Sequence, residues 1–225
     1  MDYQALKTRQ RLERDSHPPN LALRVHRALS WLNRAEQIAE DVDGHFIFLW
    51  IAFNAAYATD LDEKYRISER GAFREFLQKL ASLDKDKTIE KLVWDEFSGS
   101  IRLLLDNKYI YQDFWNHRNG KLTEPEWHRS FSAANKAART ALGHRDTPTV
   151  LSIVLSRLYT LRNQLMHGGA TWNSSVNRNQ VRDGGNLLSK LVPVVIEIMM
   201  NNANTFWGDA CYPVVDLAGM ADGAR

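Results

Sequence analysis

Residues 158–172 read "LYTLRNQLMHGGATW", an apolar run that turns polar just before two glycines. Its apolar spacing predicts a helix, and Gly168 suits the left-handed position that follows a helix C-terminus. Arg162, Asn163 and His167 come just before that end. Asn163 and His167, four residues apart, share a helix face, and the long side chain of Arg162 can bend toward it. The stretch therefore predicts a guanidinium, an amide and an imidazole gathered at a helix end that solvent can reach.

The segments around this stretch repeat the same helical pattern. Apolar residues recur at helical spacing, and no segment shows the sustained alternation of a β-strand or an internal repeat. The predicted fold class is all-α, a helical bundle with additional helices and an N-terminal arm. Helices are expected over residues 21–41, 45–60, 71–84, 87–107, 126–143, 149–168 and 181–202.

Capping and breaking residues predict where several of these helices begin, end or bend. Asn20 is a plausible N-cap for the first long helix, and Asp43-Gly44 should separate it from the next. The aromatic, turn-rich residues 109–127 predict an irregular connection that packs by its rings. Pro193, in the interior of the last helix, should kink it.

The polarity of the two ends divides the chain into three parts. Residues 1–19 are charged and closed by prolines, which predicts an arm or a short outer helix. Residues 20–202 form the expected helical domain. Residues 203–225 are interpreted as a tail, or as a strap held to the body through Phe206 and Trp207.

Composition bounds the class of protein. A net charge of +2 excludes a histone-like polycation, so a nucleic-acid partner would need local basic clustering. Cys211 is the only cysteine, which excludes an intramolecular disulfide and fits a reducing cytoplasm. The N-terminus has no apolar signal region, and the longest apolar run is too short to span a bilayer. We expect a cytoplasmic protein with no membrane partner.

Several catalytic classes have no matching motif. The chain lacks a "GxxxxGK[ST]" phosphate loop, and no set of metal ligands stands at the usual spacings. Neither a Ser-His-Asp nor a Cys-His arrangement is indicated. We therefore expect no cofactor and no metal.

The residue types at 162–167 suit phosphodiester cleavage without a metal. A histidine such as His167 can take the proton of an RNA 2′-hydroxyl or give one to the leaving 5′-oxygen. The planar, permanently charged guanidinium of Arg162 can stabilise the charge that develops on phosphorus. Asn163 could orient either group. Such a site holds only one good acid or base, so a two-fold dimer would have to supply the second.

The spacing alone is weak evidence for catalysis. Arg139 and His144, in "RTALGH", are separated by the same interval, but Gly143 ends that helix before the histidine. The structural alternative for the motif is that Arg162 pairs with an acidic neighbour and His167 only caps its helix. Spacing alone favours that alternative.

The combination "SRLYTLRNQLMHGG" resembles the motif of the HEPN superfamily, in which a late helix of an all-α domain carries an Arg, a polar residue and a His. The buried-helix pattern "LWIAFNAAY" before it resembles that family's layout, and the likeness covers roughly residues 20–202. It implies a bundle that dimerises across the motif helices. It also implies a metal-independent endoribonuclease in toxin–antitoxin, phage-defence or RNA-processing settings, with Arg162, Asn163 and His167 catalytic.

The resemblance leaves alternatives open. Some toxin members carry a Tyr two positions after the His, where this chain has Gly169, so the resemblance does not imply chemistry that uses such a Tyr. Other members have lost catalysis and bind a partner protein or a nucleotide. The implied partners are RNA, a second copy of the chain, and an antitoxin or a nucleotidyltransferase.

Further candidates lie around the motif. Aromatic, amide and cationic side chains in the following loop and helix could stack on single-stranded RNA or bind it, or could belong to an ordinary solvated loop; they are Trp172, Asn173, Asn177, Arg178 and Arg182. Asn54 is either a satisfied core amide or a supporting partner of His167.

Overall fold

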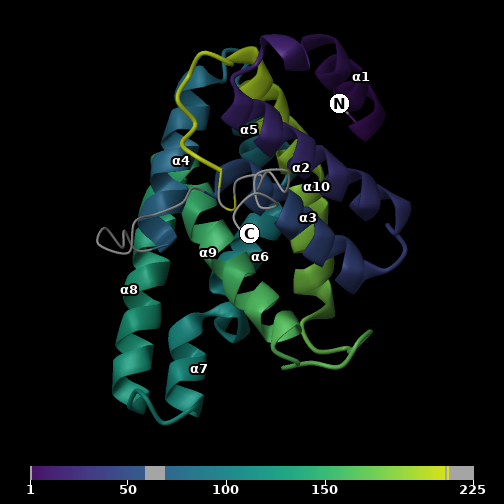
Figure 1. Cartoon of the computed structure of the whole chain (residues 1–225). Helices are drawn as coiled ribbons and strands as arrows, with labels where there is room; N and C mark the ends of the chain where they lie inside the picture. Colours follow the sequence, from purple (N-terminus) through teal and green to yellow (C-terminus); the bar gives the residue numbers. More distant parts are fainter. Residues whose placement is uncertain (1, 59–68, 211, 213–225) are drawn as a thin grey trace, which may run out of the picture.

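The structure, a computed structural model, describes residues 2–58, 69–210 and 212. Ten α-helices and no β-strand are found in these residues, which confirms the all-α prediction (Figure 1). The helices are α1 (Tyr3–Glu13), α2 (Pro19–Gln37), α3 (Val42–Tyr57), α4 (Glu69–Leu83), α5 (Thr88–Lys91), α6 (Ser98–Asp106), α7 (Gln112–Arg118), α8 (Glu124–Gly143), α9 (Thr147–Met166) and α10 (Arg178–Asn201). Shorter turns are η1 (Arg14–Ser16), the π-turn η3 (Leu92–Glu96) and the 3₁₀ turn η4 (Lys108–Ile110).

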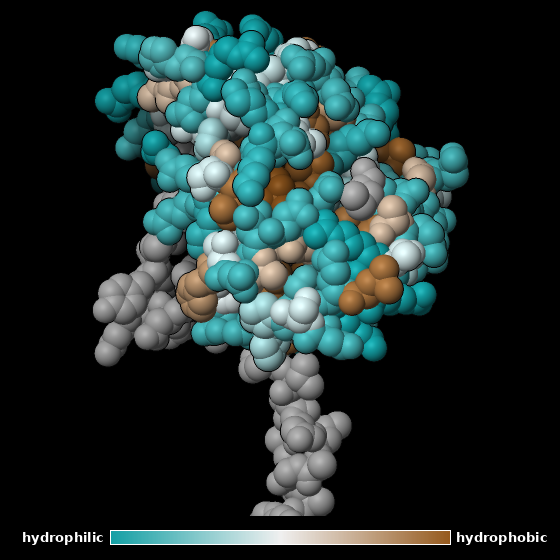
Figure 2. Space-filling model, turned by 90° about the horizontal axis from the view of Figure 1, so that it is seen from above, coloured by the Kyte–Doolittle hydropathy of each residue, from teal (hydrophilic) through white to brown (hydrophobic). Residues whose placement is uncertain are grey.

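The helices pack in two groups that share one core. Helix α3 lies between α2 and α10, and α9 lies against α4, α6 and α8. Trp50 in α3 is almost fully buried and its ring packs against Tyr159 in α9, which joins the two groups. Figure 2 shows the molecule from above, relative to Figure 1. This face is mostly hydrophilic, with apolar side chains gathered in a recess near its middle.

Helix α3 begins earlier than the sequence indicated. Asp43 and Gly44 were expected to break the chain, but both lie in the first turn of α3. The break lies at residues 38–41, and Asp41 caps α3 because its carboxylate accepts a hydrogen bond from the backbone N–H of Gly44 at 3.1 Å. Asp43 is therefore not a break in the chain. It lies in the first turn of α3, where the helix dipole stabilises its negative charge.

The start of α2 also differs from the expected one. The helix begins at Pro19, with Pro18 as the flanking residue, so Asn20 is not the N-cap. Proline is favoured in the first turn, where its missing N–H costs nothing. The Asn20 side chain instead donates a hydrogen bond to the carboxylate of Asp209, 2.6 Å away.

The middle of the chain is more divided than its pattern predicted. The single helix expected over 87–107 is split into α5, η3 and α6. The connection at 109–127 contains α7 and η4, although its rings do pack together: Phe114 and Trp127 meet edge to face, with centroids 5.4 Å apart. Amphipathic spacing fixes which face is buried, but it does not show where a turn interrupts the helix.

The tail is attached through one of the two aromatic residues expected. Trp207 is 5% exposed and packs edge to face on Phe76 of α4, whereas Phe206 is 74% exposed. The buried Arg24 of α2 donates hydrogen bonds to the carbonyls of Ala56 and Asp209, and so ties the tail to α2 and α3. Residues 211 and 213–225, with Cys211 among them, lie outside the described residues, as do residues 59 and 60.

Helix α10 approaches α3 and α9 closely at a glycine. A Cβ built on Gly184 would lie 2.7 Å from a methyl of Leu158 and 3.1 Å from the ring of Phe46. The neighbouring Gly185 has more room, because its nearest contact would be 3.5 Å away. Pro193 lies inside α10, which continues as helix to Asn201. Close packing at Gly184 thus sets how near the motif helix α9 lies to α10.

We predict that Gly184→Ala destabilises the protein by about 1–2 kcal/mol, because overpacking costs about 1–3 kcal/mol and alanine returns up to about 1 kcal/mol of helix propensity. Gly185→Ala is the matched control, expected to be neutral or to stabilise by up to about 1 kcal/mol. Urea unfolding of both variants measures the difference. Equal free energies of unfolding would contradict the packing described here.

Candidate functional site at the C-terminal end of α9

Helix α9 extends beyond the core that holds it. Its start is capped by Asp146, whose carboxylate accepts a hydrogen bond from the backbone N–H of Thr149 at 3.1 Å. Its residues are largely buried as far as Leu161, and Met166, at the other end, is 53% exposed. The candidate motif therefore begins where the core ends, and its side chains can be polar without being buried.

The helix end has the geometry that the glycines predicted. His167 is the last residue with a near-helical backbone, and Gly168 follows at a positive φ of 68°. The N–H of Gly168 donates to the carbonyl of Leu165 at 3.2 Å, and the N–H of Gly169 donates to that of Gln164 at 2.7 Å. These two bonds form a Schellman motif. A Cβ at Gly169 would lie 3.0 Å from the Gln164 carbonyl oxygen, so a larger residue is disfavoured there.

Arg162 and Asn163 are in contact. A guanidinium N–H of Arg162 (Nη1) donates a hydrogen bond of 2.9 Å to Oδ1 of Asn163, and the guanidinium carbon lies 5.9 Å from the centroid of the Tyr159 ring. Among the described residues, Arg162 forms no ion pair with a carboxylate, contrary to the structural alternative for this residue. Its guanidinium is oriented by a neutral amide, and no carboxylate of the described residues pairs with it.

His167 lies exposed at the same helix end, one turn after Asn163. Its ring forms no hydrogen bond to any residue that the structure describes, and only its backbone takes part in the helix end. The structure thus brings Arg162 and Asn163 together and leaves the imidazole free to meet a ligand beside them.

The loop after α9 is held to α3 by a charged clamp. Arg178 donates one hydrogen bond to each carboxylate oxygen of Asp43, at 3.0 and 3.1 Å, and the backbone N–H of Asn173 donates to the same carboxylate at 2.7 Å. The indole N–H of Trp172 lies 3.3 Å from Oδ1 of Asp41. A bidentate ion pair of this kind, between an arginine and a carboxylate, is among the strongest polar interactions in proteins. The Asp43 side chain is only 13% exposed.

A second anchor joins the loop to α9 itself. Gln164 donates to the carbonyl of Tyr109 at 2.7 Å and accepts from the side chain of Asn177 at 2.9 Å. Asn177 lies at the left-handed φ of 56° just before α10. Gln164, Asp41 and Asp43 position the site, yet sequence reasoning missed all three. The pattern around Asp41 could have revealed its capping role, but nothing in the sequence pairs Asp43 with Arg178.

The residues predicted to bind substrate separate into two groups. Arg178 and Asn177 are engaged in holding the loop, and Asn173 contributes its backbone to that anchoring. Trp172 is 74% exposed, and Arg182 is exposed and forms an ion pair with its neighbour Asp183, with 3.4 Å between Nε and Oδ1. The side chains of Trp172, Arg182 and Asn173 therefore remain exposed to a ligand.

Asn54 lies away from the helix end. The N-terminal residues of α3, Asp41 and Asp43, touch the loop after α9, whereas Trp50 packs on Tyr159, two turns before His167. Asn54 is one turn further along α3 in the same direction, so the structure gives no support for a contact with His167.

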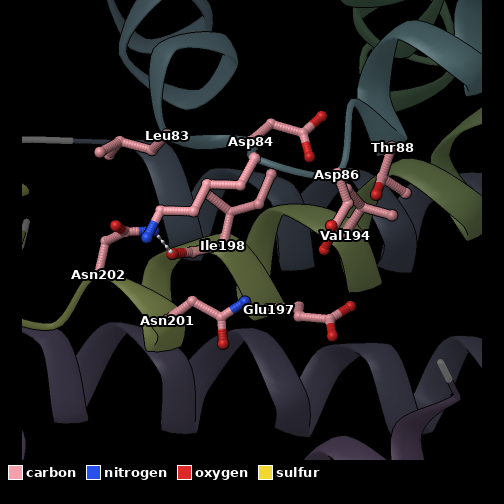
Figure 3. Close-up of a pocket in the computed structure, with 10 residues that line it drawn as sticks. Leu83, Asp84, Asp86, Thr88, Val194, Glu197, Ile198, Asn201 and Asn202 are labelled. Carbon is pink, nitrogen blue, oxygen red and sulfur yellow. Dashed lines mark hydrogen bonds between the residues drawn. The ribbon is translucent and has the colours of Figure 1, made fainter.

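A cavity of about 280 Å³ at the far end of α10 has different chemistry (Figure 3). Asp84, Asp86 and Glu197 line it, and Asp84 accepts a hydrogen bond from the backbone N–H of Ile89. It lies about 30 Å along α10 from Arg178. These three carboxylates outnumber the one cationic residue in the lining, Lys85, so the cavity disfavours a polyanion. No group of three or more His, Cys, Asp or Glu side chains placed to hold a metal ion occurs in the described part of the chain.

Comparison of the chain with protein-family models, with curated proteins and with solved structures finds no match. The likeness to the HEPN superfamily therefore stands on the motif alone. None of the described helices has both the length and the apolar composition that crossing a membrane requires.

We predict that Arg178→Gln lowers the free energy of unfolding by about 1–2 kcal/mol, because it leaves the partly buried Asp43 carboxylate without its fork of donors. Arg182→Gln, four residues along the same helix, should change it by less than about 0.5 kcal/mol, since that side chain is exposed. Urea unfolding measures both. If the two substitutions lower the free energy of unfolding equally, the Arg178–Asp43 ion pair does not hold the loop.

Proposed function

We propose that the protein is a metal-independent endoribonuclease of HEPN type that cuts RNA at the C-terminal end of α9. The observation that carries the proposal is the Arg162–Asn163 hydrogen bond of 2.9 Å beside the exposed His167. A guanidinium that pairs with no carboxylate of the described residues, and an exposed imidazole at the same helix end, are two groups that promote transesterification of RNA.

The reaction uses the 2′-hydroxyl of the RNA as nucleophile. A base removes the 2′-hydroxyl proton, the 2′-oxygen bonds to phosphorus, and the bond from phosphorus to the 5′-oxygen breaks as that oxygen gains a proton. The products are a 2′,3′-cyclic phosphate, or the phosphate formed by its hydrolysis, and a 5′-hydroxyl. His167 acts as base or acid, Arg162 binds the phosphate oxygens, and Asn163 holds the guanidinium in place.

In-line cleavage is fastest when one group takes a proton while another gives one, and each chain offers one histidine at this end. The proposal therefore includes a two-fold homodimer in which two α9 ends meet and complete the site. Met166 and Val176, which are 53% and 63% exposed beside the motif, supply apolar surface for such a contact. The resemblance to the HEPN superfamily supports a role in a toxin–antitoxin, phage-defence or RNA-processing setting, and we include an antitoxin or a nucleotidyltransferase as the partner in this proposal.

The first test is cleavage of a long single-stranded RNA in excess EDTA. Arg162→Ala should lower the rate by about 10²–10³-fold, as loss of a donor to a developing oxyanion does. His167→Ala should lower it by about 10²–10⁴-fold, the range for general acid–base groups. The matched control is Arg139→Ala/His144→Ala, which removes the same residue types at the same spacing from exposed positions elsewhere and should cut normally.

If the control variant loses as much cleavage activity as the motif variants, the motif is not the site of cleavage. Absence of cleavage by the wild-type chain would contradict the endoribonuclease proposal. That outcome would favour the catalytically inactive alternative, a module that binds a partner protein or a nucleotide through the same end.

Trp172 should contribute to RNA binding through base stacking, because its indole is anchored by its N–H edge while most of its surface stays exposed. In the His167→Ala background, Trp172→Ala should weaken binding of single-stranded RNA by about 10-fold, and Trp172→Phe by much less. Phe206→Ala is the matched control, since that ring is equally exposed, at 74%, beyond the far end of α10. Fluorescence anisotropy measures affinity. Equal effects of Trp172→Ala and Phe206→Ala would exclude a stacking role.

A further inference from the structure

The end of α9 lies between two segments that a single side chain joins. Figure 1 shows it between the η4–α7 segment and the loop of residues 168–177. Gln164 donates a hydrogen bond of 2.7 Å to the carbonyl of Tyr109 in η4 and accepts one of 2.9 Å from Asn177, at the end of that loop. The motif is therefore flanked by η4 on one side and by the loop that carries Trp172 on the other.

Tyr109 presents its ring from a turn that fixes its backbone. The Asn107 side chain accepts a hydrogen bond from the N–H of Tyr109 at 2.8 Å, and the indole N–H of Trp115 donates to the Tyr109 carbonyl at 2.8 Å. The ring meets that of Phe114 edge to face, with centroids 5.3 Å apart, yet Tyr109 is still 48% exposed. An aromatic surface held in this way loses little conformational entropy when a flat ligand stacks on it.

A positive charge accompanies this ring. Nζ of Lys108 lies 5.3 Å from the centroid of the Tyr109 ring and 5.9 Å from that of Phe114. Lys108 is exposed, and within the described part of the chain its ammonium forms no ion pair with a carboxylate. Proteins bind single-stranded nucleic acid with such pairs, because the ring stacks on a base while the cation attracts the neighbouring phosphate.

The motif lies between the two exposed rings, Tyr109 and Trp172. Three residues along a helix correspond to a rotation of about 300°, so His167 lies about 60° round α9 from Gln164 and about 4.5 Å further along. Asn163 lies about 100° round from Gln164 in the same direction. Both motif residues are thus next to the face of α9 that Gln164 turns toward η4. A strand that contacts both rings has to pass the end of α9.

We propose that the RNA crosses the end of α9 as a single strand, unpaired on both sides of the cleaved phosphate. One base stacks on Tyr109, and a base beyond the cleaved bond stacks on Trp172, while Lys108 binds a phosphate beside the first of these bases. In a duplex, neighbouring bases cover both faces of each base, so a paired strand cannot use either ring. This inference rests on the proposed endoribonuclease and names its substrate class.

The test is binding of oligouridine, an unstructured RNA, to the full chain carrying His167→Ala, measured by fluorescence anisotropy. The single strand should bind more tightly than the same strand annealed to oligoadenosine. Tyr109→Ala should weaken binding of the single strand by about 10-fold, and Tyr109→Phe by much less. Tyr212→Ala is the matched control, since that tyrosine is 86% exposed in the tail, and it should bind normally.

Two further variants separate the parts of the proposed path. Tyr109→Ala/Trp172→Ala should weaken binding by about 100-fold, because the two rings hold different bases and their losses add. Lys108→Gln should reduce the slope of log K against log salt concentration by about 0.7, the value for one phosphate contact to a single strand.

Equal binding of the single strand and the duplex, or equal effects of Tyr109→Ala and Tyr212→Ala, would overturn this inference. Cleavage by the wild-type chain is measured separately. A protein that cleaves RNA but binds it equally well without the Tyr109 ring refutes the strand path alone. A protein that binds RNA through Tyr109 but cleaves none refutes the endoribonuclease alone.

Discussion

Helix α9 continues for five residues beyond Leu161, its last buried side chain, and this overhang is the constraint on which the site depends. Within the core, polar side chains of α9 such as Arg157 and Thr160 are buried and cannot reach a ligand in solution. Beyond the core, the helix still fixes the backbone, so polar side chains are both positioned and reachable. The Schellman turn at Gly168 and Gly169 then ends the helix without consuming the His167 side chain. A helix end at the edge of the core, where Leu165 still packs, is thus the structural basis of the candidate site.

Four arginines illustrate how the fold separates structural charges from available ones. Arg24 is buried and donates to backbone carbonyls that join the tail to the body. Arg157 is buried against aromatic rings, and Arg178 is paired with Asp43. Arg162 differs because it lies partly exposed near the helix end, with the neutral amide of Asn163 as its hydrogen-bond acceptor. Only a charge that the protein orients without neutralising it can act strongly on a phosphate, which is why Arg162 carries the functional proposal.

The sequence predicted the parts of this arrangement that depend on local chemistry. Helical spacing gave the all-α class, and Gly168 marked the end of α9 because a left-handed residue is easiest for glycine. The contact of Arg162 with Asn163 followed from adjacency on a helix. The clamp between Asp43 and Arg178 could not be predicted, since it joins residues 135 positions apart whose pairing only the packing of α3 and α10 decides. For the same reason the sequence could not separate Trp172, which is available, from Arg178, which is engaged.

The central claim is that His167 and Arg162 promote attack by the RNA's own 2′-hydroxyl, and the end groups of the cleaved RNA test it most directly. Mass spectrometry of fragments produced in EDTA should find 2′,3′-cyclic phosphate, or the phosphate from its hydrolysis, on one fragment and 5′-hydroxyl on the other. Fragments that carry 5′-phosphate and 3′-hydroxyl ends would contradict the account, because attack by the 2′-oxygen cannot produce them.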